Sequence, residues 1–60
     1  MDHQEALVFA LGKEKEAVEI YRKFSIEHSA MRDLFEFLMN EEGKHVRLIE
    51  KKISELYKVC

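Results

Sequence analysis

The sequence Glu27-His28-Ser29-Ala30, near the middle of the chain, is the only segment that suits a turn. No proline occurs in the chain, and no glycine- or serine-rich linker divides it. On either side of the turn, from about 4 to 27 and from about 30 to 57, the residues favour helix. Ser29 is a reasonable N-cap for the second helix, and a connection this short, at about 28–29, brings two helices back against each other. We therefore expect a single antiparallel helical hairpin over residues 1–60.

Each predicted helix carries a seam of mostly apolar residues at alternating three- and four-residue steps, the period of a helical bundle or coiled coil. The seam of the first helix consists of Leu7, Ala10, Glu14, Ala17, Tyr21 and Phe24. The seam of the second helix consists of Phe35, Leu38, Glu42, His45, Ile49, Ile53 and Leu56. The chain is therefore predicted to be all-α.

Both helices also carry apolar residues outside these seams. They are Val8, Leu11, Val18, Leu34, Phe37, Val46 and Leu48. Each helix thus has more apolar surface than one neighbour can cover, while ordering the chain costs roughly 1.5 kcal/mol per residue. We expect the hairpin to pair with a second copy as a homodimer that forms a four-helix bundle, with larger even-numbered oligomers left open.

The composition excludes several classes of protein. Hydrophobic residues make up 47% of the chain and charged residues 37%, a balance that suits surface-charged helices better than a disordered tail. The formal net charge is -2 and basic residues alternate with acidic ones, so we expect no nucleic-acid partner. No charge-free stretch could cross a bilayer and the first residues lack a secretory signal, so we expect no membrane partner and a cytoplasmic location. Cys60 is the only cysteine, which excludes a disulfide within the chain.

Three titratable residues interrupt the seams, namely Glu14 in the first helix and Glu42 and His45 in the second. A carboxylate in a helix core is costly unless it is paired or binds a metal. Glu14 lies fourteen residues before His28 and Glu42 fourteen after it, so an antiparallel hairpin places their side chains at one height. The Glu-x-x-His spacing puts Glu42 and His45 on one helical face. In a two-fold dimer, four carboxylates and two imidazoles would meet in one bundle core.

This set of side chains indicates a metal site. Four neighbouring carboxylates repel one another unless cations supply the counter-charge, and two divalent ions per dimer would do so. Oxygen together with imidazole nitrogen suits two Fe ions, with Mn or Zn as substitutes. Two simpler alternatives remain open. Glu42 and His45 could form an exposed ion pair, and Glu14 could pair with Lys44 or Lys51 at the bundle edge.

Other polar residues near the site are assigned different roles. Glu41 is four residues before His45 but lies to one side of the seam of the second helix. His3 and His28, near a helix end and the turn, are expected to be solvated surface histidines. Tyr21, two turns beyond the first seam carboxylate on the same face, is either core filler or a hydrogen-bond donor to a ligand carboxylate.

Two segments resemble ferritin-like, rubrerythrin-type di-iron proteins. The segment Ala10-Leu11-Gly12-Lys13-Glu14-Lys15-Glu16-Ala17-Val18-Glu19-Ile20-Tyr21 is similar to their first helix, which carries a ligand Glu, then Ala at i+3 and Tyr at i+7. The segment from Leu34 to Leu48, with Glu42-Gly43-Lys44-His45, looks like their second helix with its Glu-x-x-His. This chain has one helix pair where rubrerythrins and ferritins have two. It is therefore similar in plan to half-length ferritin-like proteins, which restore the site at a dimer interface.

The resemblance implies a carboxylate-bridged di-iron centre that reacts with dioxygen or peroxide. Glu14 of each copy would bridge the two metals, while Glu42 and His45 anchor each one. The simplest activity would be that of a ferroxidase, an oxidoreductase acting on Fe(II). Two other functions stay open: a metal-free homo-oligomerisation module whose polar core residues set the register, and a metal store without turnover.

Overall fold

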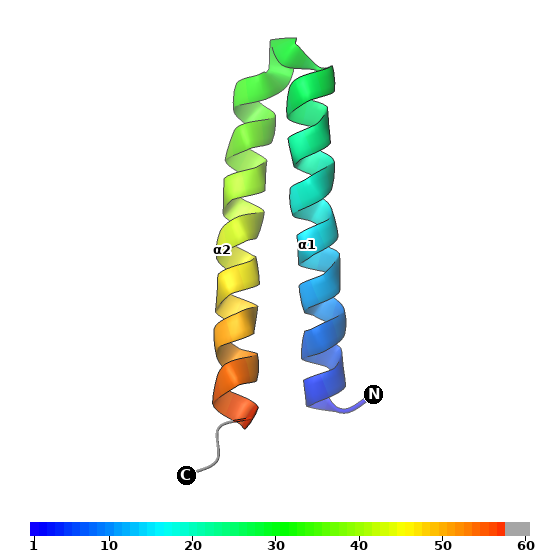
Figure 1. Ribbon diagram of the computed structural model, residues 1–60, viewed down its shortest axis with the longest axis vertical. Helices are drawn as coiled ribbons and strands as arrows, with labels where there is room; N and C mark the ends of the chain where they lie inside the picture. Colours follow the sequence, from blue (N-terminus) through cyan, green and yellow to red (C-terminus); the bar gives the residue numbers. More distant parts are fainter. Residues whose placement is uncertain (58–60) are drawn as a thin grey trace.

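The computed structural model describes residues 1–57, which form two long helices joined by a short turn (Figure 1). α1 spans His3–Glu27, the 3-10 turn η1 spans Ser29–Met31, and α2 spans Arg32–Tyr57. The two α-helices run antiparallel and lie side by side. The all-α prediction with two helices is confirmed. Neither helix combines the length and the apolar character needed to cross a membrane. Cys60, the single cysteine, lies outside the described residues.

The connection between the helices is longer than the predicted turn at about 28–29 and contains a 3-10 turn. The second helix was expected from about 30 with Ser29 as its N-cap, whereas α2 begins at Arg32 and Ser29 opens η1. The Met31 N–H donates to the His28 carbonyl at 2.8 Å, and the Arg32 N–H donates to the Ser29 carbonyl. Both bonds span three residues, the spacing of a 3-10 helix, which completes a turn with fewer residues than an α-helix. The chain therefore reverses through backbone hydrogen bonds, and the Ser29 N-cap prediction was wrong.

The first helix begins at a reciprocal cap. The Asp2 carboxylate accepts a hydrogen bond from the Glu5 N–H at 2.8 Å, and the Glu5 carboxylate accepts one from the Asp2 N–H at 3.3 Å. This capping box satisfies two donors that the first helical turn would otherwise leave free. The hydrogen bond from the Glu5 N–H lowers the pKa of Asp2, because it stabilises the ionised carboxylate.

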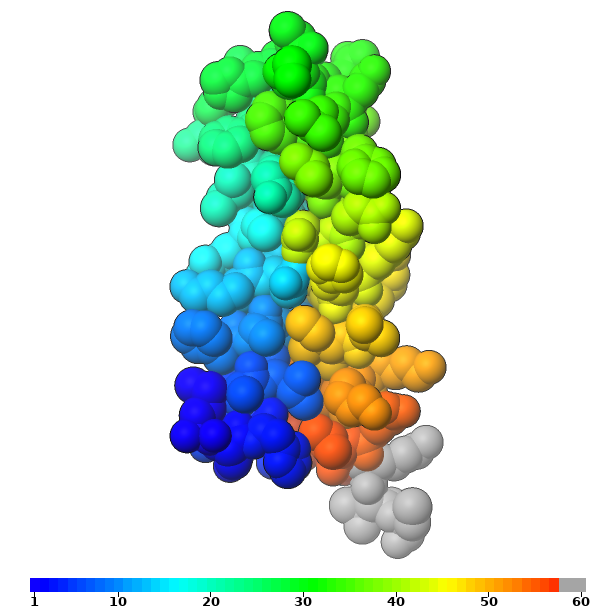
Figure 2. All heavy atoms as spheres, turned by 180° about the vertical axis from the view of Figure 1, so that it is seen from behind, coloured from blue at the N-terminus to red at the C-terminus, as the bar shows by residue number. Residues whose placement is uncertain are grey.

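The hairpin is a single layer without an enclosed apolar core. Its extents are 49 × 21 × 10 Å, and Figure 2 shows the two helices side by side along the long axis. Within residues 1–57 only Ser25 is buried, and its hydroxyl donates to the Arg22 carbonyl at 2.7 Å. Most residues of both seams are half-buried. A two-helix layer therefore leaves one side of each seam open.

The densest packing lies next to the turn, where four rings meet. The Phe24 and Phe35 rings pack edge to face at a centroid distance of 5.4 Å, and Tyr21 stacks on Phe35 at 6.3 Å. The His28 ring packs against Phe24 at 5.7 Å and Phe35 at 6.3 Å. Edge-to-face and offset ring pairs at these distances contribute beyond their buried area. We call these four residues the turn cluster, which holds the two helices in register at one end.

Candidate metal centre

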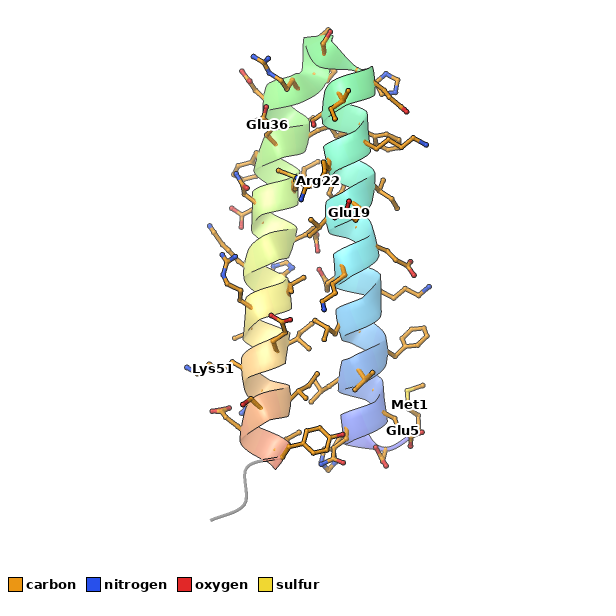
Figure 3. The ribbon with its side chains drawn as sticks, in the orientation of Figure 1. Met1, Glu5, Glu19, Arg22, Glu36 and Lys51 are labelled. Atoms are coloured by element: carbon orange, nitrogen blue, oxygen red, sulfur yellow. The ribbon has the colours of Figure 1, made fainter. Side chains whose placement is uncertain are left out.

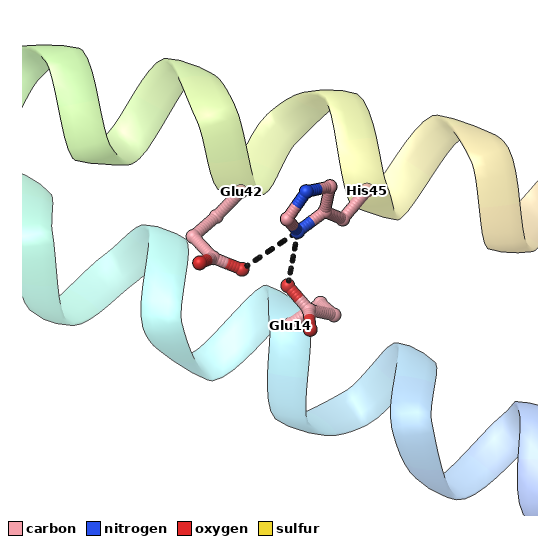
Figure 4. Close-up of side chains that lie close together, drawn as sticks. All are labelled: Glu14, Glu42 and His45. Atoms are coloured by element: carbon pink, nitrogen blue, oxygen red, sulfur yellow. Dashed lines mark ion pairs between the residues drawn. The ribbon is translucent and has the colours of Figure 1, made fainter.

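Glu14, Glu42 and His45 come together at the middle of the hairpin (Figure 4). Each side chain offers one ligand atom, and these atoms all lie within 4.8 Å of one another. The His45 Nδ1 atom lies 3.4 Å from the Glu14 Oε2 atom and 3.4 Å from the Glu42 Oε2 atom. One imidazole nitrogen thus faces two carboxylates, one from each helix.

Helix geometry and the turn explain this convergence. Glu42 and His45 are three residues apart on α2, so their side chains share one face of that helix. Glu14 on α1 is as far before His28 as Glu42 is after it, and the antiparallel arrangement therefore sets the two carboxylates at one height. The structure brings together the three residues that were predicted as metal ligands.

The Glu14 carboxylate has an orphaned oxygen. Its Oε2 atom is enclosed by protein, yet it accepts no hydrogen bond. The contact with His45 Nδ1 at 3.4 Å involves this same oxygen, and it is an electrostatic contact without hydrogen-bond geometry. An acceptor that is buried without a partner costs about 1–3 kcal/mol, and more when it is charged. Within residues 1–57 this oxygen faces only the His45 imidazole, so a bound cation would compensate its charge.

Within residues 1–57, His45 is the only basic side chain that contacts the two carboxylates. Among residues 1–57, neither Glu14 nor Glu42 forms an ion pair with a lysine or arginine. The ten ion pairs of this part of the chain give these two residues only His45 as a partner. Lys44 pairs instead with Glu41 at 3.3 Å, and Lys51 projects away from α1 (Figure 3). The structure therefore does not support pairing of Glu14 with either lysine.

The burial of the three side chains is graded. Glu14 is 29% exposed and Glu42 23%, whereas His45 is 52% exposed. The carboxylates thus lie between the helices and the imidazole lies at the edge of the site. The alternative of an exposed ion pair between Glu42 and His45 is met in part. The two residues are in contact and His45 is exposed, but Glu42 is mostly covered and the same nitrogen also faces Glu14.

The remaining predicted residues lie elsewhere. His3 and His28 are exposed, as expected, and Glu41 is held by Lys44. The i, i+3 spacing of that pair was a signal that sequence reasoning missed. Tyr21 belongs to the turn cluster, and its hydroxyl donates to neither carboxylate within the described residues. Its packing matches the core-filler alternative, and a role beside the metal stays a prediction.

The donor set of one hairpin fits a divalent cation but does not complete its coordination. Two carboxylate oxygens and one imidazole nitrogen suit iron, manganese or zinc. Three donors leave a position open even at a four-coordinate ion, and more at an ion that prefers six ligands. Bidentate or bridging carboxylates, water or a second copy of the chain would have to supply the rest.

Comparison with known proteins does not identify the family. No family model matches the chain, and neither the curated proteins nor the solved structures contain a match. The ferritin-like resemblance therefore stays a prediction that rests on the two helical motifs and on the geometry of the three side chains.

Proposed function

We propose that this chain is a half-length, ferritin-like di-iron carboxylate protein that oxidises Fe(II) with dioxygen or peroxide. Two copies would form a four-helix bundle, and Glu14, Glu42 and His45 of both copies would hold two Fe ions. The observation that carries the proposal is the enclosed, unpartnered Glu14 Oε2 atom beside a second carboxylate and an imidazole. An uncompensated carboxylate between two helices is stabilised most directly by a bound cation.

The surface around His45 supports a second copy as the partner. Steps of three and four residues along α2 join Leu34, Phe37, Glu41, His45 and Leu48 into one stripe. Leu34 is 46% exposed, Phe37 58% and Leu48 67%. The exposed His45 side chain therefore lies in a stripe whose other exposed members are mostly apolar. We call these five residues the α2 stripe. A partner that covers the α2 stripe also covers the site.

The position of the site along the hairpin suits two-fold symmetry. Glu14 and Glu42 lie near the middle of α1 and α2, so a two-fold axis at their height aligns both helices of one copy with those of the other over most of their length. The same axis brings the second set of three ligands to the first. The six side chains then supply four carboxylates and two imidazoles for two metals.

In the proposed reaction Fe(II) is the substrate. Each Fe(II) gives up one electron, so two ions held side by side supply the two electrons that reduce dioxygen, with two protons, to hydrogen peroxide. Within the chain, the carboxylates of Glu14 and Glu42 hold the ions close together by offsetting their charge. His45 completes the set of donors at the outer edge of each half-site.

The test is anaerobic Fe(II) titration of the assembled protein followed by mixing with oxygenated buffer. Fast oxidation should saturate at two Fe(II) per dimer, and oxygen should be consumed in parallel.

His45→Ala should slow the fast phase by at least about tenfold, because each half-site loses a donor. His28→Ala is the matched control and should leave the rate unchanged. A fast phase that survives His45→Ala would overturn the proposal, and tight binding without oxygen consumption would indicate a metal store.

A further inference from the structure

The charges of the site matter for assembly as well as for metal binding. Each hairpin brings three carboxylates to the proposed interface. Glu41 of the α2 stripe is paired with Lys44, whereas Glu14 and Glu42 have no lysine or arginine partner within residues 1–57. Two hairpins together thus bring four carboxylates without such a partner, and two imidazoles. Even with both imidazoles protonated, two negative charges would remain without compensation. They would lie where a partner excludes water, and there the repulsion between like charges is stronger than in solvent.

A single hairpin buries little apolar surface that could offset this repulsion. None of its apolar side chains within the described residues is fully enclosed, and its apolar side chains along the α2 stripe are exposed. Burial of that stripe against a partner is the main favourable term left to the fold. The same contact that buries the apolar residues thus forces the uncompensated carboxylates together.

From this conflict we propose that divalent metal controls the assembly of two copies of this chain. Two divalent ions carry four positive charges, which equal the charge of the four carboxylates. The metal-loaded dimer buries the α2 stripe without repulsion between the carboxylates. The metal-free dimer can bury the stripe only by bringing the repelling carboxylates together. The inference rests on the proposed metal site and adds that the metal acts as the ligand that joins the copies. Iron supply would then set how much assembled protein exists.

The test uses Zn²⁺, which binds the same donor types but undergoes no redox change. Sedimentation equilibrium of the whole chain, in chelator and then in excess Zn²⁺, gives the dimer dissociation constant in each state. We expect Zn²⁺ to tighten dimerisation by on the order of 10- to 100-fold, the usual range of coupling between two binding events. Helical content from circular dichroism should rise with the dimer, because the hairpin lacks a core of its own.

A pair of charge variants separates electrostatic control from simple bridging by metal. The double change Glu14→Gln and Glu42→Gln removes the repulsion at nearly constant size, so this variant should dimerise in chelator about as well as wild type does in Zn²⁺. The control, Glu16→Gln with Glu19→Gln, makes the same change in net charge on α1 residues that pair with Lys13 and Arg22. The control should keep the dependence on Zn²⁺.

The outcomes distinguish this inference from the proposed function. Calorimetric Zn²⁺ binding with a dimer constant equal in chelator and in Zn²⁺ would overturn metal-controlled assembly and leave the iron site standing. Zn²⁺-dependent dimerisation in a protein that does not oxidise Fe(II) would support the inference and overturn the ferroxidase proposal. Absence of any Zn²⁺ binding would overturn both.

Discussion

His45 and His28 are both exposed histidines on the same hairpin, but their surroundings differ in kind. His45 lies at the middle, with its Nδ1 atom 3.4 Å from one carboxylate of each helix. His28 lies at the turn, where its ring packs against Phe24 and Phe35. The first ring faces two carboxylates that have no lysine or arginine partner within residues 1–57, and the second packs against two apolar rings. Residue type alone therefore does not identify a ligand, whereas the charges that face the ring do.

The comparison extends to the two regions. The turn cluster is packed and holds the helices in register, so its side chains contribute mainly to the free energy of unfolding. The middle contains two carboxylates and an oxygen without a hydrogen-bond partner, so it costs stability until a cation binds. Substitutions in one region should therefore affect stability, and substitutions in the other should affect metal affinity.

The largest effect is expected from Glu14→Gln, which removes the charge of the carboxylate that carries the orphaned oxygen, at nearly constant size. The Zn²⁺ affinity should fall by at least about 100-fold, because losing even an outer group that supports a ligand costs 10- to 100-fold. His28→Gln, a change confined to the turn cluster, should leave the affinity unchanged. Isothermal titration calorimetry measures both. Equal losses of Zn²⁺ affinity in the two variants would show that the middle of the hairpin and the turn cluster do not differ in metal binding.

The melting temperature should report the same contrast. At a free Zn²⁺ concentration of 100 times the dissociation constant, binding to the folded state adds about 2.7 kcal/mol. That corresponds to a rise of about 10–20 °C for a domain of this size. Circular dichroism at fixed protein concentration measures the shift, and chelator should reverse it. His28→Ala should keep the full shift, whereas an unreduced shift in His45→Ala would show that the ion binds elsewhere.

A smaller effect is expected when the turn cluster loses its central ring. Phe35→Ala removes contacts with Tyr21, Phe24 and His28 and should lower the free energy of unfolding by about 2 kcal/mol, less than for a fully buried phenylalanine. Phe9→Ala is the control, because the Phe9 ring is 57% exposed and has Lys13 as its cation-π partner. Chemical denaturation gives both values. A Phe9→Ala loss as large as that of Phe35→Ala would contradict the packing role of the cluster.

The smallest effect concerns the N-terminal cap and its dependence on pH. The folded pKa of Asp2 lies below its ordinary value of 3.8, so the ionised cap stabilises the fold above that value. This contribution is lost as the pH falls through the folded pKa. Asp2→Asn keeps a capping side chain that cannot titrate. The melting temperature of this variant should therefore lack the decrease that the wild type shows as the Asp2 carboxylate is protonated. Thermal melts from neutral to acidic pH compare the two. The Asp2 carboxylate is fully exposed, so a loss larger than that in Phe35→Ala would contradict the ranking.

The helices and the convergence of the three ligands could be predicted from the sequence because both follow from periodicity. Helical spacing fixes which residues share a face, and equal distances from the turn fix their height. The conformation of Ser29–Met31 could not be predicted in the same way. Its two i+3 hydrogen bonds depend on how closely α1 and α2 dock, which residue propensities do not encode.

The charge balance of the site could be predicted only in part. Glu41 lies three residues before Lys44, so helical spacing alone could have predicted their ion pair. The orphaned Glu14 Oε2 atom, by contrast, depends on the three-dimensional positions of its neighbours. The candidate ligands were therefore predictable, whereas the observation that most favours a cation was not.

The absence of an enclosed core bears on how long an unassembled chain would survive. A layer one helix thick opens readily, and proteases cleave the opened form in proportion to its population when opening is fast. Exposed leucine, phenylalanine and lysine side chains along both helices offer cleavage sites throughout. A partner on the α2 stripe would cover Leu34, Phe37 and Leu48 and would also oppose opening of the hairpin. The lifetime of the polypeptide would then be governed by the rate at which it finds a second copy, and hence by its own rate of synthesis together with the supply of metal.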